Sequence, residues 1–187
     1  MKIYTIIGGV NGAGKSSLTG AIKARTNLGK IIDVDKLAKE SKISGLEAGK
    51  RAVTLIDDCL KKGVSFTQET TLSGTKTLNT VQKARELGYT IRLFYVGLDT
   101  AEECLKRIKN RVARGGHDIG TEDVLRRFDS RFESLIKILP YCDEVTFFDN
   151  DNGFVGVAEY KNGDLIKIGK TPKWICELSD TLTGDIK

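Results

Sequence analysis

Short apolar segments alternate with segments of helical periodicity along most of this 187-residue chain. The apolar segments are rich in β-branched and aromatic residues, which is typical of buried strands, whereas the segments between them repeat apolar residues every three or four positions. We expect strands at 3–7, 30–35, 64–69, 90–97 and 144–149, and helices at 16–26, 46–62, 75–87, 99–114 and 121–139. The alternation predicts an α/β fold with a mainly parallel sheet between two layers of helices.

Two of these helices carry an apolar face that we expect to pack on the sheet. The helix at 46–62 also ends in a C-cap signal, since Lys62-Gly63 places a glycine where a left-handed residue closes a helix. The expected faces are Leu46, Gly49, Val53, Ile56 and Leu60 in this helix, and Leu125, Phe128, Phe132, Leu135 and Leu139 in the helix at 121–139.

Two hairpins are expected in the second half of the chain. The helices at 99–114 and 121–139 are joined through Gly115-Gly116, so residues 99–139 are predicted to form an antiparallel helical hairpin that covers the sheet as a lid. Near the C-terminus, two short strand-like runs flank Asn162-Gly163, a strong turn signal, and predict a β-hairpin at 154–169. No repeat or linker interrupts the pattern, so residues 1–187 are expected to form one domain.

Composition limits the classes of function and location. Thirty Lys and Arg against 25 Asp and Glu give a net charge of +5, a bias that favours anionic ligands and that a nucleotide alone explains, without nucleic acid. No apolar run approaches the roughly 20 residues of a membrane-spanning helix, and the first strand begins directly after the N-terminus, so we expect a cytoplasmic protein. The four cysteines are widely spaced and are expected to be reduced structural thiols.

Residues 9–16 read Gly-Val-Asn-Gly-Ala-Gly-Lys-Ser and match the phosphate-binding pattern G-x-x-x-x-G-K-[ST] at every position. The motif follows an expected strand and precedes an expected helix, which is the context that it requires. Lys15 is expected to reach the β- and γ-phosphates of ATP, and the Ser16 hydroxyl to bind Mg²⁺. The predicted ATP-binding residues are Gly9, Val10, Asn11, Gly12, Ala13, Gly14, Lys15, Ser16 and Ser17. The fold is therefore expected to be that of P-loop NTPases.

Asp35 stands at the expected carboxyl end of the second strand, where ligands gather in open α/β sheets. A carboxylate there could orient an acceptor hydroxyl and remove its proton. The alternative is that Asp35 is a helix N-cap, a position that Asp also favours. Asp33, on the same strand face, is a lesser candidate for a contact to magnesium.

Polar residues also follow the third expected strand, at Glu69-Thr70-Thr71. Two interpretations remain open from the residues alone: substrate positioning, or a strand-to-helix turn in which a hydroxyl caps the next helix.

Arginines cluster on both helices of the expected lid. Arg107, Arg111 and Arg114 share one helix face, and Arg127 and Arg131 share another. A hairpin closing over a triphosphate would bring guanidinium groups to the transferred phosphate, although a solvated basic face is the alternative for any single arginine. His117, the single histidine, lies at the tip of this hairpin without a partner that would tune its pKa, so no catalytic role is expected for it.

Taken together, these features resemble the zeta toxin family of P-loop kinases. The resemblance rests on the P-loop, on Asp35, on the segment Glu-Thr-Thr-Leu-Ser-Gly at 69–74, and on Arg-Gly-Gly-His-Asp at 114–118 leading to Arg127. It spans residues 3–150. The resemblance implies a kinase that uses ATP and Mg²⁺ to phosphorylate a hydroxyl of a sugar nucleotide such as UDP-N-acetylglucosamine, with an antitoxin protein as a possible partner.

The same resemblance implies a role for particular residues. Asp35 would be the general base on the acceptor hydroxyl. Glu69 and Thr71 would contact the acceptor, and Arg114 and Arg127 would clamp the phosphates from the lid. Two alternatives remain: a kinase for another hydroxyl, such as a nucleic-acid end or a small metabolite, and an ATP-binding switch without an acceptor.

Overall fold

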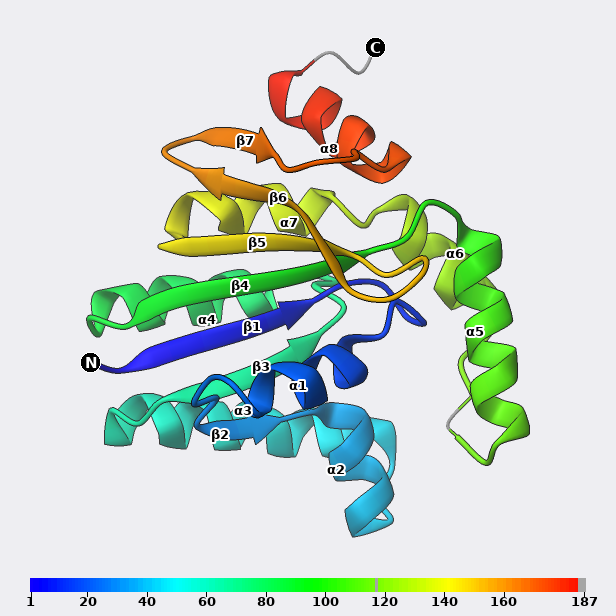
Figure 1. The fold of residues 1–187 in the computed structure, drawn as a ribbon. Helices are drawn as coiled ribbons and strands as arrows, with labels where there is room; N and C mark the ends of the chain where they lie inside the picture. The colour runs from blue at the N-terminus through cyan, green and yellow to red at the C-terminus, as the bar shows by residue number, and fades with distance from the viewer. Residues whose placement is uncertain (117, 185–187) are drawn as a thin grey trace.

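The computed structural model describes residues 1–116 and 118–184 and has a seven-stranded sheet at its centre (Figure 1). The strand order is β2-β3-β1-β4-β5-β6-β7; the first five strands run parallel, β6 pairs antiparallel with β5, and β7 pairs antiparallel with β6. Their bounds are β1 Ile3–Gly8, β2 Lys30–Ile32, β3 Phe66–Thr70, β4 Thr90–Gly97, β5 Glu144–Asp149, β6 Val155–Lys161 and β7 Asp164–Lys167. The predicted α/β fold with a mainly parallel sheet is confirmed.

Helices cover both faces of the sheet, because its central strands are apolar on both sides. On one face, residues of β1 and β4 such as Ile7 and Val96 pack with α1 (Lys15–Lys23), α5 (Ala101–Ala113) and α6 (Thr121–Asp129). On the other, Tyr4 and Leu93 belong to a larger core with α3 (Gly45–Lys62), α4 (Lys76–Glu86), α7 (Glu133–Ile138) and α8 (Lys173–Thr183). A further helix, α2 (Val34–Ser41), packs against α3. No helix within the described ranges is long and apolar enough to span a membrane.

The buried face of α3 differs from the predicted one. Leu46 and Val53 are 73% and 44% exposed, whereas Ala48 and Ala52 are buried with Ile56. The small alanine side chains let the helix backbone lie close to the sheet, so the contact face is rotated toward them and the larger apolar residues turn outward. Leu125 of α6 is likewise 40% exposed while its neighbour Val124 is buried.

The single helix predicted at 121–139 is also wrong, because the chain forms α6, then α7, then a 3-10 turn at Leu139–Tyr141. Arg131 lies at the interruption. Its guanidinium lies over the rings of Phe128 and Phe132, with 4.1 Å and 4.5 Å to the ring centroids, and also donates to the main-chain oxygen of Phe128. The same group forms an ion pair with Glu177 of α8. The oxygen that would continue the helix ladder is thus bound by a side chain.

The C-terminal segment is attached at the carboxyl ends of β4 and β5. The expected hairpin is formed by β6 and β7, and β6 pairs with β5. Trp174 of α8 donates its backbone N–H to Asp99 and its indole N–H to Asp149, both at 2.9 Å. Its ring covers Gly97, where a Cβ atom would lie 2.3 Å from the ring. These contacts fix the start of α8 at the carboxyl ends of β4 and β5, and the helix lies beyond β6 and β7 (Figure 1).

Candidate active site

The segment between β1 and α1 has the backbone of a phosphate-binding loop. Gly9 and Gly12 have φ angles of 145° and 82°, in the range that side chains rarely adopt. A Cβ atom would lie 2.4 Å from the Val96 oxygen at Gly9 and 2.7 Å from the Cys104 oxygen at Gly12. Only glycine fits these two positions, so the loop can wrap tightly and present its N–H groups and the α1 N-terminus to an anion.

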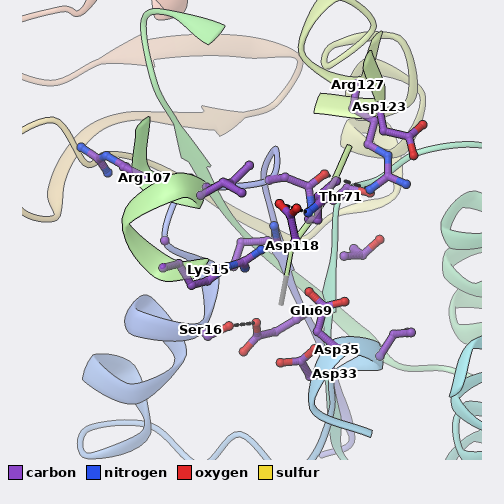
Figure 2. A pocket seen from close by; sticks show the side chains of 18 of the residues that line it. Lys15, Ser16, Asp33, Asp35, Glu69, Thr71, Arg107, Asp118, Asp123 and Arg127 are labelled. Atoms are coloured by element: carbon purple, nitrogen blue, oxygen red, sulfur yellow. Dashed lines mark hydrogen bonds between the residues drawn. The ribbon is translucent and has the colours of Figure 1, made fainter. Parts of the chain in front are cut away.

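A cavity of about 630 Å³ opens in front of this loop. Its walls come from the P-loop, the start of α2, the end of β3 and the two lid helices α5 and α6 (Figure 2). The polar residues that line it are Asn11, Lys15, Ser16, Ser17, Asp33, Asp35, Gln68, Glu69, Thr70, Thr71, Arg107, Arg111, Asp118, Asp123 and Arg127. Most of the residues singled out in the sequence thus face one space.

Lys15 lies across the P-loop and donates from Nζ to the main-chain oxygens of Gly9 and Val10, at 2.8 Å and 3.0 Å. Burial lowers the pKa of this ammonium to about 8, and the nearby carboxylate of Glu69 opposes that shift. A partly buried cation whose described hydrogen bonds go to carbonyl oxygens would gain strongly from a phosphate.

Glu69 lies on the P-loop side of β3. Its carboxylate accepts a hydrogen bond from the Ser16 hydroxyl at 2.8 Å (Figure 2). It accepts a second one from the Thr19 hydroxyl at 2.5 Å. Burial raises the pKa of Glu69, and the Thr19 hydrogen bond opposes the shift. An acceptor contact was expected here. The structure instead directs the carboxylate at the serine of the P-loop.

The residues at this position fit Mg²⁺. A serine hydroxyl and a carboxylate, joined by a hydrogen bond beside the phosphate loop, are hard oxygen donors of the kind that hold the magnesium of P-loop enzymes. Among the described residues, no group of three or more His, Cys, Asp or Glu lies close enough to hold a metal without such a phosphate. The four cysteines are free.

Two aspartates take different positions from those expected. β2 ends at Ile32, and Asp33 is the N-cap of α2, accepting from the N–H groups of Asp35 and Lys36 at 2.9 Å and 3.3 Å. Burial raises the pKa of Asp33. Asp35 therefore lies in the first helical turn rather than on a strand, and the alternative that it caps a helix is wrong. Its exposed side chain faces the cavity, and no hydrogen bond to it is found in the part of the chain that the structure describes.

The face of β3 opposite Glu69 carries Gln68, a residue that sequence reasoning missed. The buried Tyr4 hydroxyl donates to Gln68 Oε1, and Gln68 also lines the cavity. Burial raises the pKa of Tyr4, so the hydroxyl keeps its proton and needs this acceptor. Thr71 also lines the cavity, and its hydroxyl contacts Ser73 at 3.0 Å. A polar residue inside a buried strand was the available signal for Gln68.

The arginines of the lid divide into three groups. Arg127 reaches the P-loop, donating to Asn11 Oδ1 at 2.9 Å. Arg107 and Arg111 line the cavity, and Arg107 also donates to Glu103 at 2.9 Å and to the Asn150 main-chain oxygen at 2.6 Å. Arg114 does not line this cavity; it is exposed at the end of α5 and lines a second pocket. The expected meeting of Arg114 with Arg127 is therefore not found.

The remaining predicted residues have structural roles or lie elsewhere. Val10 and Ala13 are buried beneath the loop, which serves phosphate binding through its backbone. Arg131 does not belong to a solvated basic face, since only 12% of its side chain is exposed. His117 lies outside the described residues.

Known proteins resemble this chain in sequence and in fold. No protein-family model matches it. An uncharacterized protein of Haemophilus influenzae is 33% identical over 125 residues, which are 64% of this chain and 88% of that protein.

The structural likenesses are to proteins of under 20% identity. The AvrRxo1-ORF1:AvrRxo1-ORF2 complex with sulphate ions matches 96% of this chain with a TM-score of 0.69 at 16% identity, and the same complex with ATP matches 98% with a TM-score of 0.66 at 17%. This chain spans 64% of the length of the matched AvrRxo1 chain. The PezAT chromosomal toxin–antitoxin system of Streptococcus pneumoniae gives a TM-score of 0.62 at 17% identity, over 99% of this chain and 87% of that one. At these identities the likeness establishes the fold.

Proposed function

We propose that this chain, which belongs to the same family as the Haemophilus influenzae protein and has the fold of the zeta-toxin-like P-loop kinases, is an ATP- and magnesium-dependent phosphotransferase. One observation carries the proposal. Lys15 and Ser16 of the P-loop, Arg127 of the lid and the carboxylate of Asp35 line the same cavity. A phosphate-binding loop alone would suit a switch, whereas a carboxylate that lines the same cavity and makes no hydrogen bond to the described residues supplies a base for an acceptor.

The residues divide the reaction between them. Asp35 takes the proton of the acceptor hydroxyl, whose oxygen attacks the γ-phosphorus of ATP; the bond to the β-phosphate oxygen breaks, leaving ADP and a phosphorylated acceptor. Lys15 of the P-loop and Arg127 of α6 offset the charge on the transferred group. Ser16 and Glu69 would hold Mg²⁺, which neutralises the charge of the phosphates.

We assign a sugar nucleotide such as UDP-N-acetylglucosamine as the acceptor. The resemblance in the segments 69–74 and 114–118 supports this choice, as do the Gln68 amide and the Thr71 hydroxyl, which suit the hydroxyl and carbonyl groups of a sugar. An antitoxin is the protein partner we propose, and a co-purifying protein that blocks ATP turnover would identify it. Such an enzyme would act in the cytoplasm, where ATP and sugar nucleotides are found.

The pure protein, given ATP, Mg²⁺ and a panel of sugar nucleotides, sugars and 5′-hydroxyl oligonucleotides, is expected to add one phosphate to a sugar nucleotide. Mass spectrometry of the panel measures this directly. A phosphorylated oligonucleotide and unchanged sugar nucleotides would favour the kinase for nucleic-acid ends. Hydrolysis of ATP with no product in any acceptor would favour the switch.

Replacing Arg127 by Gln is expected to lower single-turnover phosphate transfer by about 10²- to 10³-fold, as for loss of one donor to a transition-state charge. Arg126→Gln is the matched control, because Arg126 is the next residue of α6 but 67% of its side chain is exposed, where it pairs with Asp123. Equal losses in both variants would contradict the role of Arg127.

Arg114 lies apart from Arg127, so the effects of replacing each of them on phosphate transfer are expected to be additive in the double variant.

A further inference from the structure

A second pocket of about 460 Å³ lies between α2 and the C-terminal part of α5. It is more open than the active-site cavity. Four cationic side chains line it together with one amide, and no carboxylate lines it within the described ranges of the chain. The lining residues are Lys39, Arg107, Asn110, Arg111, Arg114, Gly115 and Gly116. This concentration of donors suits an anionic group.

The second pocket continues from the active-site cavity, since Arg107 and Arg111 line both. The positions of its residues on α2 and α5 show how far the second pocket lies from Asp35. Lys39 lies four residues after Asp35 on α2, so the two residues share a helix face about one turn, or ~5.4 Å, apart. Arg114 lies three residues after Arg111 on the same face of α5. The pocket is therefore displaced by about one helical turn from the proposed base.

The end of α5 holds Arg111 in place. Gly116 donates its backbone N–H to the Arg111 oxygen at 2.9 Å. A Cβ atom at Gly116 would lie 2.5 Å from Arg111 Cγ, so the glycine lets the chain close directly over the stem of this side chain. The backbone and the base of the side chain of Arg111 are thereby held between the two pockets that this residue lines.

We infer that this second pocket binds a phosphate group of the acceptor. The inference rests on the proposed kinase function and deepens it: the phosphates of a sugar-nucleotide acceptor would lie in the second pocket, about one turn along α2 from Asp35. The phosphates of ATP have their own site at the P-loop, which Lys39 and Arg114 do not line. Arg114 does not line the active-site cavity, and in the second pocket it would contact the phosphate of the acceptor.

Binding of inorganic pyrophosphate tests the pocket without knowledge of the acceptor. Calorimetry is done with Mg²⁺ and a non-hydrolysable ATP analogue present, so that the P-loop is occupied. Lys39→Gln and Arg114→Gln are each expected to weaken pyrophosphate binding about ten-fold, the loss of one charge-assisted contact. Lys36→Gln and Lys106→Gln are matched controls on α2 and α5, since both side chains are exposed and paired with a glutamate of their own helix.

Steady-state kinetics of the same variants test the second pocket separately from the proposed kinase activity. With UDP-N-acetylglucosamine, Lys39→Gln and Arg114→Gln are expected to raise the acceptor KM about ten-fold and leave kcat within about two-fold; with phosphate-free N-acetylglucosamine they should change nothing. If no acceptor is phosphorylated but pyrophosphate binding depends on both residues, the pocket stands and the kinase proposal fails. Equal pyrophosphate binding in all four variants and the wild type would mean an adventitious ion only. Either that result or the absence of any pyrophosphate binding would overturn the inference.

Discussion

The Lys15→Ala variant is expected to have no measurable nucleotide-dependent activity while keeping its fold. The side chain is partly buried and lines the cavity, and its described hydrogen bonds go to the two loop oxygens at Gly9 and Val10, so its charge is available to a phosphate. The substitution removes one donor to the transferred group and to the bound triphosphate. We expect turnover to fall by at least about 10²- to 10³-fold. ATP turnover and thermal unfolding are measured on the same preparation.

The stability readout distinguishes a functional lysine from a structural one. Folding leaves the pKa of Lys15 below its ordinary value, at about 8, so the charged form is disfavoured in the folded protein. The unfolded chain therefore binds more protons between about pH 8 and 10.5, and wild-type stability gains with rising pH in that window. The variant should lack this gain and be at least as stable at pH 7. Normal turnover in a well-folded Lys15→Ala protein would show that the P-loop is not the active site.

Asp35→Asn is expected to keep ATP affinity and lose phosphate transfer by about 10²- to 10⁴-fold, the usual contribution of a general base. The amide keeps the shape of the side chain but cannot accept the acceptor proton. Asp35 makes no capping contact, so the substitution should leave the melting temperature unchanged.

Asp33→Asn is the matched comparison. Asp33 also lines the cavity, but its carboxylate accepts from two N–H groups of α2, and an asparagine caps a helix nearly as well. Single-turnover transfer and ATP binding are measured for both variants. Transfer within a few-fold of wild type in Asp35→Asn would mean that another group is the base.

Local signals in the sequence were sufficient for much of the fold. The P-loop was predictable because its glycines, lysine and serine must follow one another at fixed spacing between a strand and a helix. The central strands were predictable because they are buried on both faces and are therefore apolar almost throughout. β4, at Thr90–Gly97, has the predicted bounds.

The residues of a helix that reach the cavity or the core could not be predicted, because this depends on how the helix is placed and rotated against its neighbours. Arg107, Arg111 and Arg114 share one face in the sequence pattern, yet the first two line the active-site cavity while the third lies beyond it. The pattern gives the face but not where along the helix the cavity ends. The outward turn of Leu46 has a similar cause, because packing of the small Ala48 decided the rotation of α3.

The roles of Asp33 and Gln68 were missed for a different reason. Each role is set by a partner: Asp33 by the N–H groups of a helix that begins within the expected strand, and Gln68 by the hydroxyl of Tyr4, which is distant in sequence. Periodicity carries no information on such contacts.

The two edges of the sheet have a consequence for how another protein can bind. β2 is only three residues long and β7 only four, and both carry charged residues, Lys30 on one side and Asp164 and Lys167 on the other. Short charged edges are poor templates for strand addition, the route by which sheets aggregate or recruit extended peptides. A partner of this protein would accordingly recognise side chains on its helices and loops, and the open hydrogen-bonding groups of its backbone would play little part in the complex.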